Sequence, residues 1–270
     1  MTAAPGGRFA GRVCLVTGST GMGGSAARAI AAEGGSVFVV SRTPGHAEAL
    51  ARAIVADGGR AVGYAADLTQ EAEVEAAFAA CLEQAGRLDA VYSAAGISGR
   101  RFGDGPLDAA TLEGWETVMR TNATSQFLVC RAAIRRMLGQ APDAAGGRGV
   151  ILTMSSTLAT HPAPRYFATH AYAASKGAIE GLTRAAAAFY APHGIRLNVI
   201  APGLVATPMS RRAQADPEIL AYVARRQPLA AGPLATDAVT RTALYLLSDE
   251  ASMVTGQVVA VDGGWGISEG

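Results

Sequence analysis

Short apolar segments alternate with helical patterns along most of this sequence, and no other feature constrains the fold as strongly. The apolar segments have the length of strands, and the helical patterns between them run for about 10–20 residues. We predict strands at residues 12–17, 36–40, 61–66, 88–94, 149–154, 196–200 and 257–261, and helices at 26–33, 46–56, 71–85, about 112–138 and about 172–190. Such alternation is typical of βαβ units, in which helices cover both faces of a parallel sheet.

We therefore expect one doubly wound α/β domain over residues 1–270, with a seven-stranded parallel sheet and an N-terminal tail at 1–10. Half of the residues are apolar and 17% are charged, which supplies enough apolar material for one large core. No low-complexity linker divides the chain. Ligands of such sheets bind at the carboxyl ends of the strands, so the residues that follow each strand are the first candidates for a functional site.

Composition argues against several classes of protein. The chain has 23 basic and 22 acidic residues, a formal charge of +1 and no basic stripe, so nucleic acid is not an expected partner. No apolar stretch approaches the roughly 18 residues of a membrane span, and the first ten residues lack the apolar segment of a secretory signal. The three cysteines and four histidines show no metal-binding spacing. We expect a cytoplasmic protein without a metal site or a membrane partner.

Lysine occurs once, at Lys176, whereas arginine occurs 22 times. A chain that uses arginine so widely is expected to keep a lysine where a compact ammonium is needed. Lys176 follows Tyr172 by four residues, so the two side chains share one face of a predicted helix. The ordinary pKa of tyrosine is about 10, and a nearby ammonium lowers it toward the range useful for acid–base catalysis. The pair is therefore a candidate for catalysis.

A glycine-rich loop lies between the first predicted strand and the first predicted helix. Glycines at this junction allow a tight turn and let backbone N–H groups approach a pyrophosphate at the helix N-terminus. A flexible turn without a ligand is the alternative interpretation, and the position of the loop favours a nucleotide site. The residues expected to contact the dinucleotide here are Gly18, Ser19, Thr20, Gly21, Met22 and Gly23.

From residue 12 to about residue 264 the chain resembles the short-chain dehydrogenase/reductase family, in its 250-residue branch. This resemblance implies a Rossmann fold that binds a nicotinamide dinucleotide. The usual glycine pattern of the branch is TGxxxGxG, whereas Gly18, Gly21 and Gly24 fit TGxxGxxG, the spacing of the family's extended branch. A one-residue deletion after Ser19 gives the alternative set Gly18, Gly21 and Gly23.

The end of the second predicted strand indicates which dinucleotide is bound. An acidic side chain there would bind the ribose hydroxyls of NAD and repel a 2′-phosphate. The chain instead has Ser41 and Arg42, a hydroxyl and a guanidinium suited to phosphate. We expect NADP(H) as the preferred cofactor, with NAD(H) possible if Arg42 only begins a surface loop.

The resemblance also implies a catalytic tetrad. Tyr172 is implied as the general acid–base residue, Lys176 as a ribose ligand, and Asn122 as the residue that holds a proton-relaying water. Asn122 is otherwise a tolerated polar residue at a helix bend. The family pattern places the catalytic serine at Ser156. Adjacent strand residues face opposite ways and the loop before Tyr172 is about three residues longer than usual, so Ser155 is the alternative.

Further contacts are implied after the other strands. Asp67 and Leu68 resemble the family's adenine-contacting pair, and Ser93 begins a segment that stands where the family has Asn-Asn-Ala-Gly. Both asparagines are missing, and the serine hydroxyl is a partial substitute. The cofactor contacts expected from these later segments are Ser93, Ala95, Gly96, Pro202, Gly203, Val205 and Thr207.

Residues 204–234 are expected to form a substrate lid. Its arginines meet either an anionic substrate or solvent, and the usual exposure of charges favours solvent. His161 and His170, in the lengthened loop, are weaker candidates for substrate contact. The lid arginines in question are Arg211, Arg212, Arg225 and Arg226.

Together these features predict an NADP(H)-dependent oxidoreductase that transfers a hydride between nicotinamide and a small-molecule ketone or secondary alcohol. One alternative is a nucleotide-sugar epimerase or dehydratase of the extended branch, which the glycine spacing suggests and the chain length disfavours. Another is a non-catalytic dinucleotide-sensing regulator, which would not need Ser156, Tyr172 and Lys176. Similar proteins are usually homotetramers, and we expect the same here.

Overall fold

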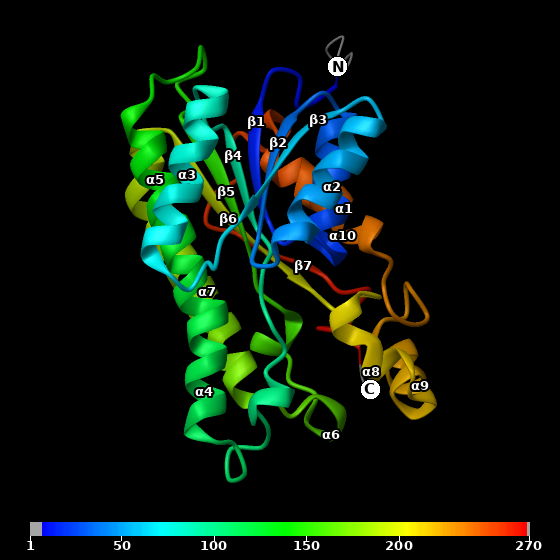
Figure 1. Ribbon diagram of the computed structural model, residues 1–270. Helices are drawn as coiled ribbons and strands as arrows, with labels where there is room; N and C mark the ends of the chain where they lie inside the picture. The colour runs from blue at the N-terminus through cyan, green and yellow to red at the C-terminus, as the bar shows by residue number, and fades with distance from the viewer. Residues whose placement is uncertain (1–6, 269–270) are drawn as a thin grey trace.

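One seven-stranded sheet runs through the protein, for which a computed structural model describes residues 7–268 (Figure 1). All its strand pairs are parallel, in the order β3-β2-β1-β4-β5-β6-β7. The order changes direction between β1 and β4, which opens a crevice at the carboxyl ends of these strands. The strands are β1 (Val13–Thr17), β2 (Ser36–Ser41), β3 (Arg60–Ala65), β4 (Ala90–Ser93), β5 (Gly149–Met154), β6 (Ile195–Pro202) and β7 (Val258–Val261).

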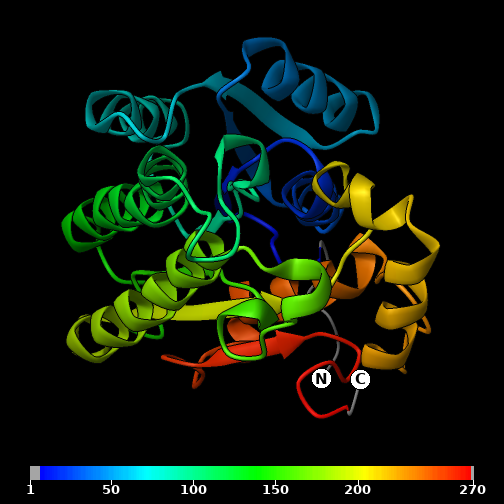
Figure 2. The same cartoon turned by 90° about the horizontal axis from the view of Figure 1, so that it is seen from below.

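Helices cover both faces of the sheet, as Figures 1 and 2 show. One face packs against α1 (Gly21–Ala32), α2 (Pro44–Ala56) and α10 (Thr236–Leu247). The other packs against α3 (Glu71–Ala85), α5 (Ser125–Gly139) and α7 (His170–Tyr190). The predicted doubly wound Rossmann fold with helices on both faces is therefore confirmed.

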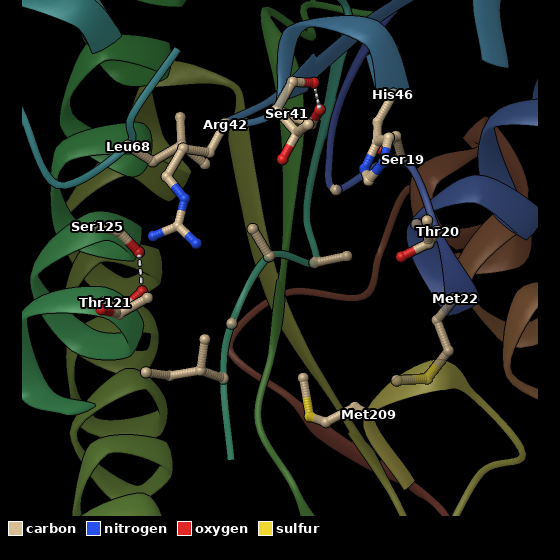
Figure 3. Close-up of a pocket in the computed structure, with 18 of the residues that line it drawn as sticks. Ser19, Thr20, Met22, Ser41, Arg42, His46, Leu68, Thr121, Ser125 and Met209 are labelled. Atoms are coloured by element: carbon tan, nitrogen blue, oxygen red, sulfur yellow. Dashed lines mark hydrogen bonds between the residues drawn. The ribbon is translucent and has the colours of Figure 1, made fainter. Parts of the chain in front are cut away.

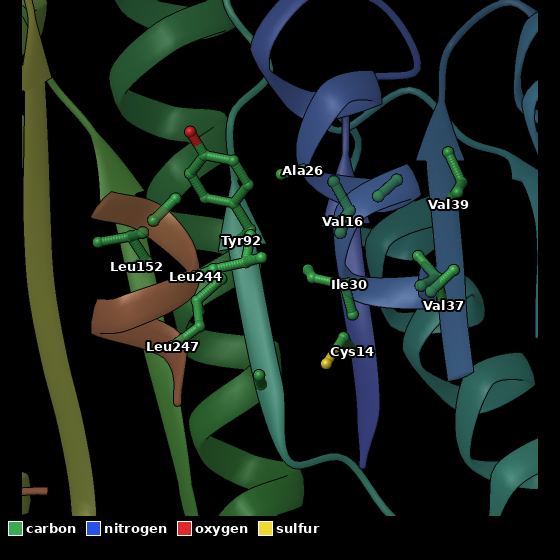
Figure 4. Close-up of a cluster of buried hydrophobic side chains, with 14 of the residues drawn as sticks. Cys14, Val16, Ala26, Ile30, Val37, Val39, Tyr92, Leu152, Leu244 and Leu247 are labelled. Atoms are coloured by element: carbon green, nitrogen blue, oxygen red, sulfur yellow. The ribbon is translucent and has the colours of Figure 1, made fainter. Parts of the chain in front are cut away.

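The continuous apolar runs of the strands follow from this two-sided burial. All five residues of β1 are buried, and their side chains alternate between the two cores. Val16 packs toward α1 and α10, whereas Leu15 packs toward the other face. Figure 4 shows the first of these cores, in which Ile30 of α1 lies beside Val16 of β1 and Leu244 of α10 lies beside Tyr92 of β4.

Several helical regions differ from the sequence-based expectation, including α6 (Pro164–Phe167), α8 (Arg211–Gln214) and α9 (Pro217–Arg226). No helix was predicted between residues 234 and 257, yet α10 lies there and packs against α1. Its buried Val239, Ala243 and Leu247 recur at a spacing of four residues, the pattern of a helix with one apolar face. The helix expected at 112–138 is divided into α4 (Leu112–Val118), a π-helical segment (Met119–Thr124) and α5. Such π-helical turns frequently occur at functional sites.

Short helices gather at the carboxyl edge of the sheet, in the lower part of Figure 1. They include α4, α6, α8 and α9. Val205 and Leu234 form an isolated parallel bridge at the two ends of the predicted lid, so this segment leaves and rejoins the fold at one place. Within residues 7–268, no helix combines the length and apolar character needed to cross a membrane.

The predicted N-terminal tail is shorter than expected. Phe9 is 1% exposed, and Arg8 donates two hydrogen bonds of 2.6 Å to Glu33. Residues 7–10 therefore pack against the end of α1, because an apolar ring and an ion pair anchor them. The rest of the predicted tail, residues 1–6, lies outside the described part of the chain.

Tyr92 provides a test of this core. Its hydroxyl is buried and has no hydrogen-bond partner within the described residues. A buried polar group without a partner costs about 1–3 kcal/mol, so Tyr92→Phe is expected to raise the free energy of unfolding by up to about 1 kcal/mol. Leu152→Ala, in the same core (Figure 4), is the contrasting variant and should lower it by about 2–5 kcal/mol. Denaturant unfolding measures both, and a destabilised Tyr92→Phe would contradict the prediction.

Candidate active site

A cleft of about 310 Å³ crosses the carboxyl ends of β1 to β4 (Figure 3). The glycine loop lines one side, and the loops after β2, β3 and β4 line most of the remainder. Thr121, Ser125 and residues 207–209 complete the lining. Most of the residues that the sequence assigned to a dinucleotide lie on its walls. These are Gly18, Ser19, Thr20, Gly21, Met22, Gly23, Ser41, Arg42, Asp67, Leu68, Ala95, Gly96 and Thr207.

The glycine loop has the backbone needed for close approach of an anion. Gly18 and Gly21 have φ values of +90° and +54°, a conformation that other residues rarely adopt. A Cβ atom at Gly23 would lie 2.3 Å from the Gly18 carbonyl oxygen, so glycine is required there too. Gly24 is buried in the first turns of α1 and does not line the cleft. The residues at the cleft therefore correspond to the second of the two proposed glycine alignments.

The N-terminus of α1 fits a pyrophosphate. Thr20 is the N-cap residue, and its side chain makes no capping hydrogen bond. The first backbone N–H groups of a helix have no partner within the helix, and they favour negative charge. In α1 they are available to phosphate oxygens at the wall of the cleft.

The far end of the cleft, after β2, contains the expected phosphate-binding pair. Arg42 is exposed and makes no ion pair or hydrogen bond within the described residues, and Figure 3 shows its guanidinium directed into the cleft. The hydroxyl of Ser41 donates to the Thr43 carbonyl at 3.1 Å. His46 lies across the cleft from Arg42 and was not predicted. Asp67 accepts two hydrogen bonds from Thr69 at 2.8 and 2.9 Å, which fix the turn after β3.

Six of the expected cofactor residues do not line the cleft, namely Ser93, Tyr172, Lys176, Pro202, Gly203 and Val205. Ser93 is 1% exposed within β4, and Pro202 is buried at the end of β6. The hydroxyl of Thr17, at the end of β1, accepts hydrogen bonds from the backbone N–H groups of Ala94 and Ala95 at 3.0 and 3.2 Å. Thr17, rather than Ser93, therefore holds the loop in which the family's asparagines are missing.

A second pocket of about 300 Å³ adjoins the cleft and shares Met22, Thr207 and Met209 with it. Gly203 and Val205, also expected to contact the cofactor, line this pocket. Its apolar walls come from the lengthened loop, the lid and the C-terminal segment. These walls include Leu158, Phe167, Leu204, Met209 and Trp265.

Ser156 and Tyr172 both line this second pocket. Burial raises the pKa of Tyr172 above its ordinary value, and a hydrogen bond with Ser156 opposes the rise. The sequence-based expectation was a lowered pKa, caused by the ammonium of Lys176. In the structure that ammonium lies 5.5 Å from the centre of the Tyr172 ring, and burial has the larger effect.

The two adjacent serines face different surroundings. Ser155 points away from the pocket, where its hydroxyl donates to Glu180 Oε1 at 2.8 Å and to the Lys176 carbonyl at 3.2 Å. The alternation of side chains along an extended strand then turns Ser156 toward the pocket. The lengthened loop therefore does not shift the register of the pair.

Lys176 belongs to α7, and its side chain reaches the loop that follows β4, on the side of that loop opposite the cofactor cleft. The side chain is 3% exposed, and its Nζ donates to the Met154 carbonyl at 2.9 Å. Burial lowers the pKa of Lys176 to about 8. A Cβ atom at Gly96 would lie 3.6 Å from this Nζ and 3.0 Å from Asn122 Oδ1. Because residue 96 is a glycine, it places no side chain between the Lys176 ammonium and the cleft. Only the backbone of Gly96 separates them.

Asn122 joins the π-helical segment to two other elements. Its Oδ1 accepts from the Ile97 N–H at 2.8 Å, and its Nδ2 donates to the Ile97 carbonyl at 3.1 Å and to Ser175 Oγ at 3.1 Å. The side chain is fully buried. Asn122 is therefore a connection between the loop after β4 and helix α7, rather than a polar residue tolerated at a bend.

Asp104 is a site residue that the sequence analysis missed. This buried carboxylate accepts hydrogen bonds of 3.0 Å from the backbone N–H groups of both Ala171 and Tyr172. A carboxylate stabilises a helix N-terminus, and here it fixes the turn that carries Tyr172. Asp104 is distant in sequence from α7, and no local motif marks it.

The C-terminal segment contributes a wall that was also missed. Trp265 is 2% exposed, and its Nε1 donates to the His161 carbonyl at 3.2 Å. The Arg226 guanidinium lies 5.2 Å from the Trp265 ring centre and donates to the Trp265 carbonyl at 3.0 Å. The signal that could have indicated this wall is a tryptophan in a chain with only 6% aromatic residues.

His161 and His170, the weaker candidates for substrate contact, do not line the second pocket.

Comparison with known proteins places this geometry in a family. A sequence profile described as enoyl-(acyl carrier protein) reductase matches residues 16–266. The cis-4-hydroxycyclohexanecarboxylate dehydrogenase of Sinomonas cyclohexanicum is 36% identical over 258 residues, which are 95% of this chain and 97% of that protein.

Solved structures agree with these sequence matches. A short-chain type dehydrogenase/reductase from Mycobacterium ulcerans has a TM-score of 0.88 and 32% identity, over 97% of this chain and 92% of the other. A gluconate 5-dehydrogenase from Burkholderia cenocepacia, in complex with NADP and tartrate, has a TM-score of 0.85 and 32% identity, over 96% of both chains. The resemblance inferred from sequence is confirmed: this chain belongs to the short-chain dehydrogenase/reductase family of oxidoreductases.

Proposed function

We propose that this protein is an NADP(H)-dependent oxidoreductase that interconverts a small-molecule ketone and the corresponding secondary alcohol. The observation that carries the proposal is the pairing of Ser156 and Tyr172 in a pocket that adjoins a dinucleotide-shaped cleft. Lys176, the single lysine of the chain, lies behind Gly96 between the two spaces. The dehydrogenase relatives support this chemistry, since their substrates are named as alcohols.

In this proposal each member of the tetrad has a separate role. The nicotinamide, when bound, supplies or accepts the hydride. Tyr172 donates a proton to the substrate oxygen during reduction and accepts it during oxidation. Ser156 donates a hydrogen bond to the same oxygen. Lys176 supplies positive charge beside Tyr172 and binds ribose hydroxyls, while Asn122 holds the Ile97 backbone and α7 in register and orders the proton-relaying water.

Three features support NADP(H) as the preferred cofactor. No acidic residue follows β2, Arg42 is directed into the cleft without a counterion among the described residues, and Ser41 adds a hydroxyl. The gluconate 5-dehydrogenase solved with NADP is a relative with this cofactor. NAD(H) is the alternative that the same cleft would accept without the 2′-phosphate contact.

We also propose a cytoplasmic homotetramer with no nucleic-acid or membrane partner. Large apolar side chains are exposed along α4, α5 and α7, where subunit contact would cover them. The exposed residues on these helices are Leu112, Trp115, Phe127, Leu138 and Phe189.

The two rival functions differ from this proposal in measurable ways. A dinucleotide-sensing regulator would bind nucleotide without turning over any alcohol, and the presence of both Tyr172 and Ser156 at the second pocket argues against it. An extended-branch epimerase or dehydratase was suggested by glycine spacing, but the cleft is lined by Gly18, Gly21 and Gly23. The length match to a dehydrogenase, 97% of that protein, also disfavours it.

The central experiment is the variant Tyr172→Phe, assayed with a panel of ketones and both reduced nucleotides. Loss of the hydroxyl removes the proton donor, so kcat should fall by roughly 10²- to 10⁴-fold while NADPH still binds. Tyr166→Phe is the control, because Tyr166 does not line the pocket and its hydroxyl donates to Glu218 at 3.3 Å. Turnover by Tyr172→Phe close to that of the wild type would exclude Tyr172 as the proton donor.

The adjacent serines give a second prediction. Ser156→Ala should lower kcat/KM by about 100-fold, because it removes a donor to the substrate oxygen. It should also lower the free energy of unfolding by about 0.5–2 kcal/mol, because Ser156 Oγ accepts from the Leu158 N–H at 3.2 Å. Ser155→Ala instead leaves the buried Glu180 without its hydroxyl partner, so it should lower the free energy of unfolding by about 1–3 kcal/mol. Steady-state kinetics and denaturant unfolding on both variants separate the two effects. Reversal of the kinetic order would move the site to Ser155.

Cofactor preference gives a third prediction. Arg42→Ala should weaken NADPH binding by roughly 10- to 150-fold, the value of a charge-assisted hydrogen bond, and should change NADH binding little. Arg52→Ala is the control, because Arg52 is an exposed arginine on α2 that does not line the cleft. Titration calorimetry with both nucleotides measures the difference. Equal losses for NADPH and NADH would contradict recognition of the 2′-phosphate by Arg42.

A further inference from the structure

Two arginines from distant parts of the chain meet at the wall of the second pocket. Arg100 lies in the short 3-10 turn Arg100–Phe102 after β4, and Arg212 lies in α8 of the lid. Both donate to the same acceptor, the Tyr166 carbonyl, at 2.8 and 2.9 Å. The two guanidinium groups are therefore neighbours, although neither element would bring them together alone.

This pair has no anionic partner in the described chain. Neither guanidinium forms a salt bridge within residues 7–268, whereas nearby Arg165 pairs with Glu218 at 3.6 Å. Asp104 is the carboxylate that acts on Arg100, but its oxygens are bonded to the N-terminus of α7. Both side chains are exposed, and partial desolvation together with the neighbouring charge of Arg212 lowers the pKa of Arg100.

Unused donors remain at both residues. A guanidinium has five N–H donors, and each of these arginines makes one side-chain hydrogen bond within the described residues. An anion placed between them would accept the other donors and relieve the repulsion, and the planar guanidinium suits a carboxylate especially well. The other three lid arginines considered from sequence do not line the pocket.

The rest of the pocket indicates which other chemical groups the ligand carries besides its negative charge. Ser156 and Tyr172 form one polar group, and Arg100 and Arg212 form another. Arg101 also lines the pocket, with its guanidinium 4.6 Å from the centre of the Phe102 ring, and the remaining wall combines apolar side chains with a few hydroxyl groups. A volume of about 300 Å³ admits a small molecule only. The ligand therefore needs a hydroxyl or carbonyl, an apolar body and a negative charge.

We propose that the substrate is a hydroxy or oxo acid with an apolar body, whose carboxylate is bound by Arg100 and Arg212. This inference rests on the proposed oxidoreductase function, because Ser156 and Tyr172 must receive the reacting oxygen. It adds a specificity site, formed when the loop after β4 and the lid come together, that distinguishes acids from neutral alcohols.

A binding measurement tests the arginine pair without any turnover. Cyclohexanecarboxylate and its neutral counterpart cyclohexanecarboxamide are titrated into the NADP⁺-loaded enzyme by calorimetry. We expect the carboxylate to bind at least 10-fold more tightly, and this advantage to disappear in Arg100→Met and in Arg212→Met. Arg211→Met is the matched control, since it is an exposed neighbour of Arg212 outside the pocket lining. Equal binding of acid and amide by the wild type would overturn the proposal.

Turnover supplies the second arm. With NADPH, 4-oxocyclohexanecarboxylate should have a kcat/KM at least 10-fold above that of its methyl ester. Each arginine variant should lower the value for the acid by roughly 10- to 100-fold and that for the ester by less than about 3-fold. Equal losses for acid and ester would overturn the anion site while leaving the oxidoreductase function intact. Carboxylate binding that depends on both arginines, without reduction of any ketone, would support the anion site and overturn the proposed function.

Discussion

A buried amide holds the carboxyl edge of this protein together. Asn122 makes three hydrogen bonds, two to Ile97 in the loop after β4 and one to Ser175 in α7. Inside a protein such bonds gain strength from the low local dielectric, and a lost partner is costly. The cofactor cleft depends on the position of that loop, and the second pocket depends on α7. The hydrogen bonds of Asn122, in the π-helical segment, therefore help to fix the position of the cofactor cleft relative to the second pocket.

Other buried polar groups reinforce the same edge. Thr17 fixes the backbone at Ala94 and Ala95, and Asp104 fixes the first turn of α7 at Tyr172. Each of these side chains satisfies backbone groups that would otherwise be orphaned at the end of a strand or helix. The reacting groups thus lie on backbone that is held from behind. The substrate pocket in front of them keeps mostly apolar walls.

Local pattern was sufficient for much of this architecture. The seven strands, the glycine loop and the spacing of Tyr172 and Lys176 depend on neighbours in sequence, so they were predictable. Asp104, Arg100 and Trp265 act through partners at least 39 residues away, and no local signal marks such contacts. The direction of the Tyr172 pKa was wrong for the same reason, because the degree of burial is a property of the folded chain. The α10 helix is different, since its periodic pattern was present and was overlooked.

The place of Trp265 has a consequence for the order in which the molecule is built. The chain emerges from the ribosome from its N-terminus, and the strands and loops that form most of the dinucleotide cleft precede residue 126. The substrate pocket acquires its tryptophan wall only when residue 265 has been made, and that wall is attached to α9 by Arg226. The walls of the nucleotide cleft are therefore mostly translated well before the pocket for the other reactant can close.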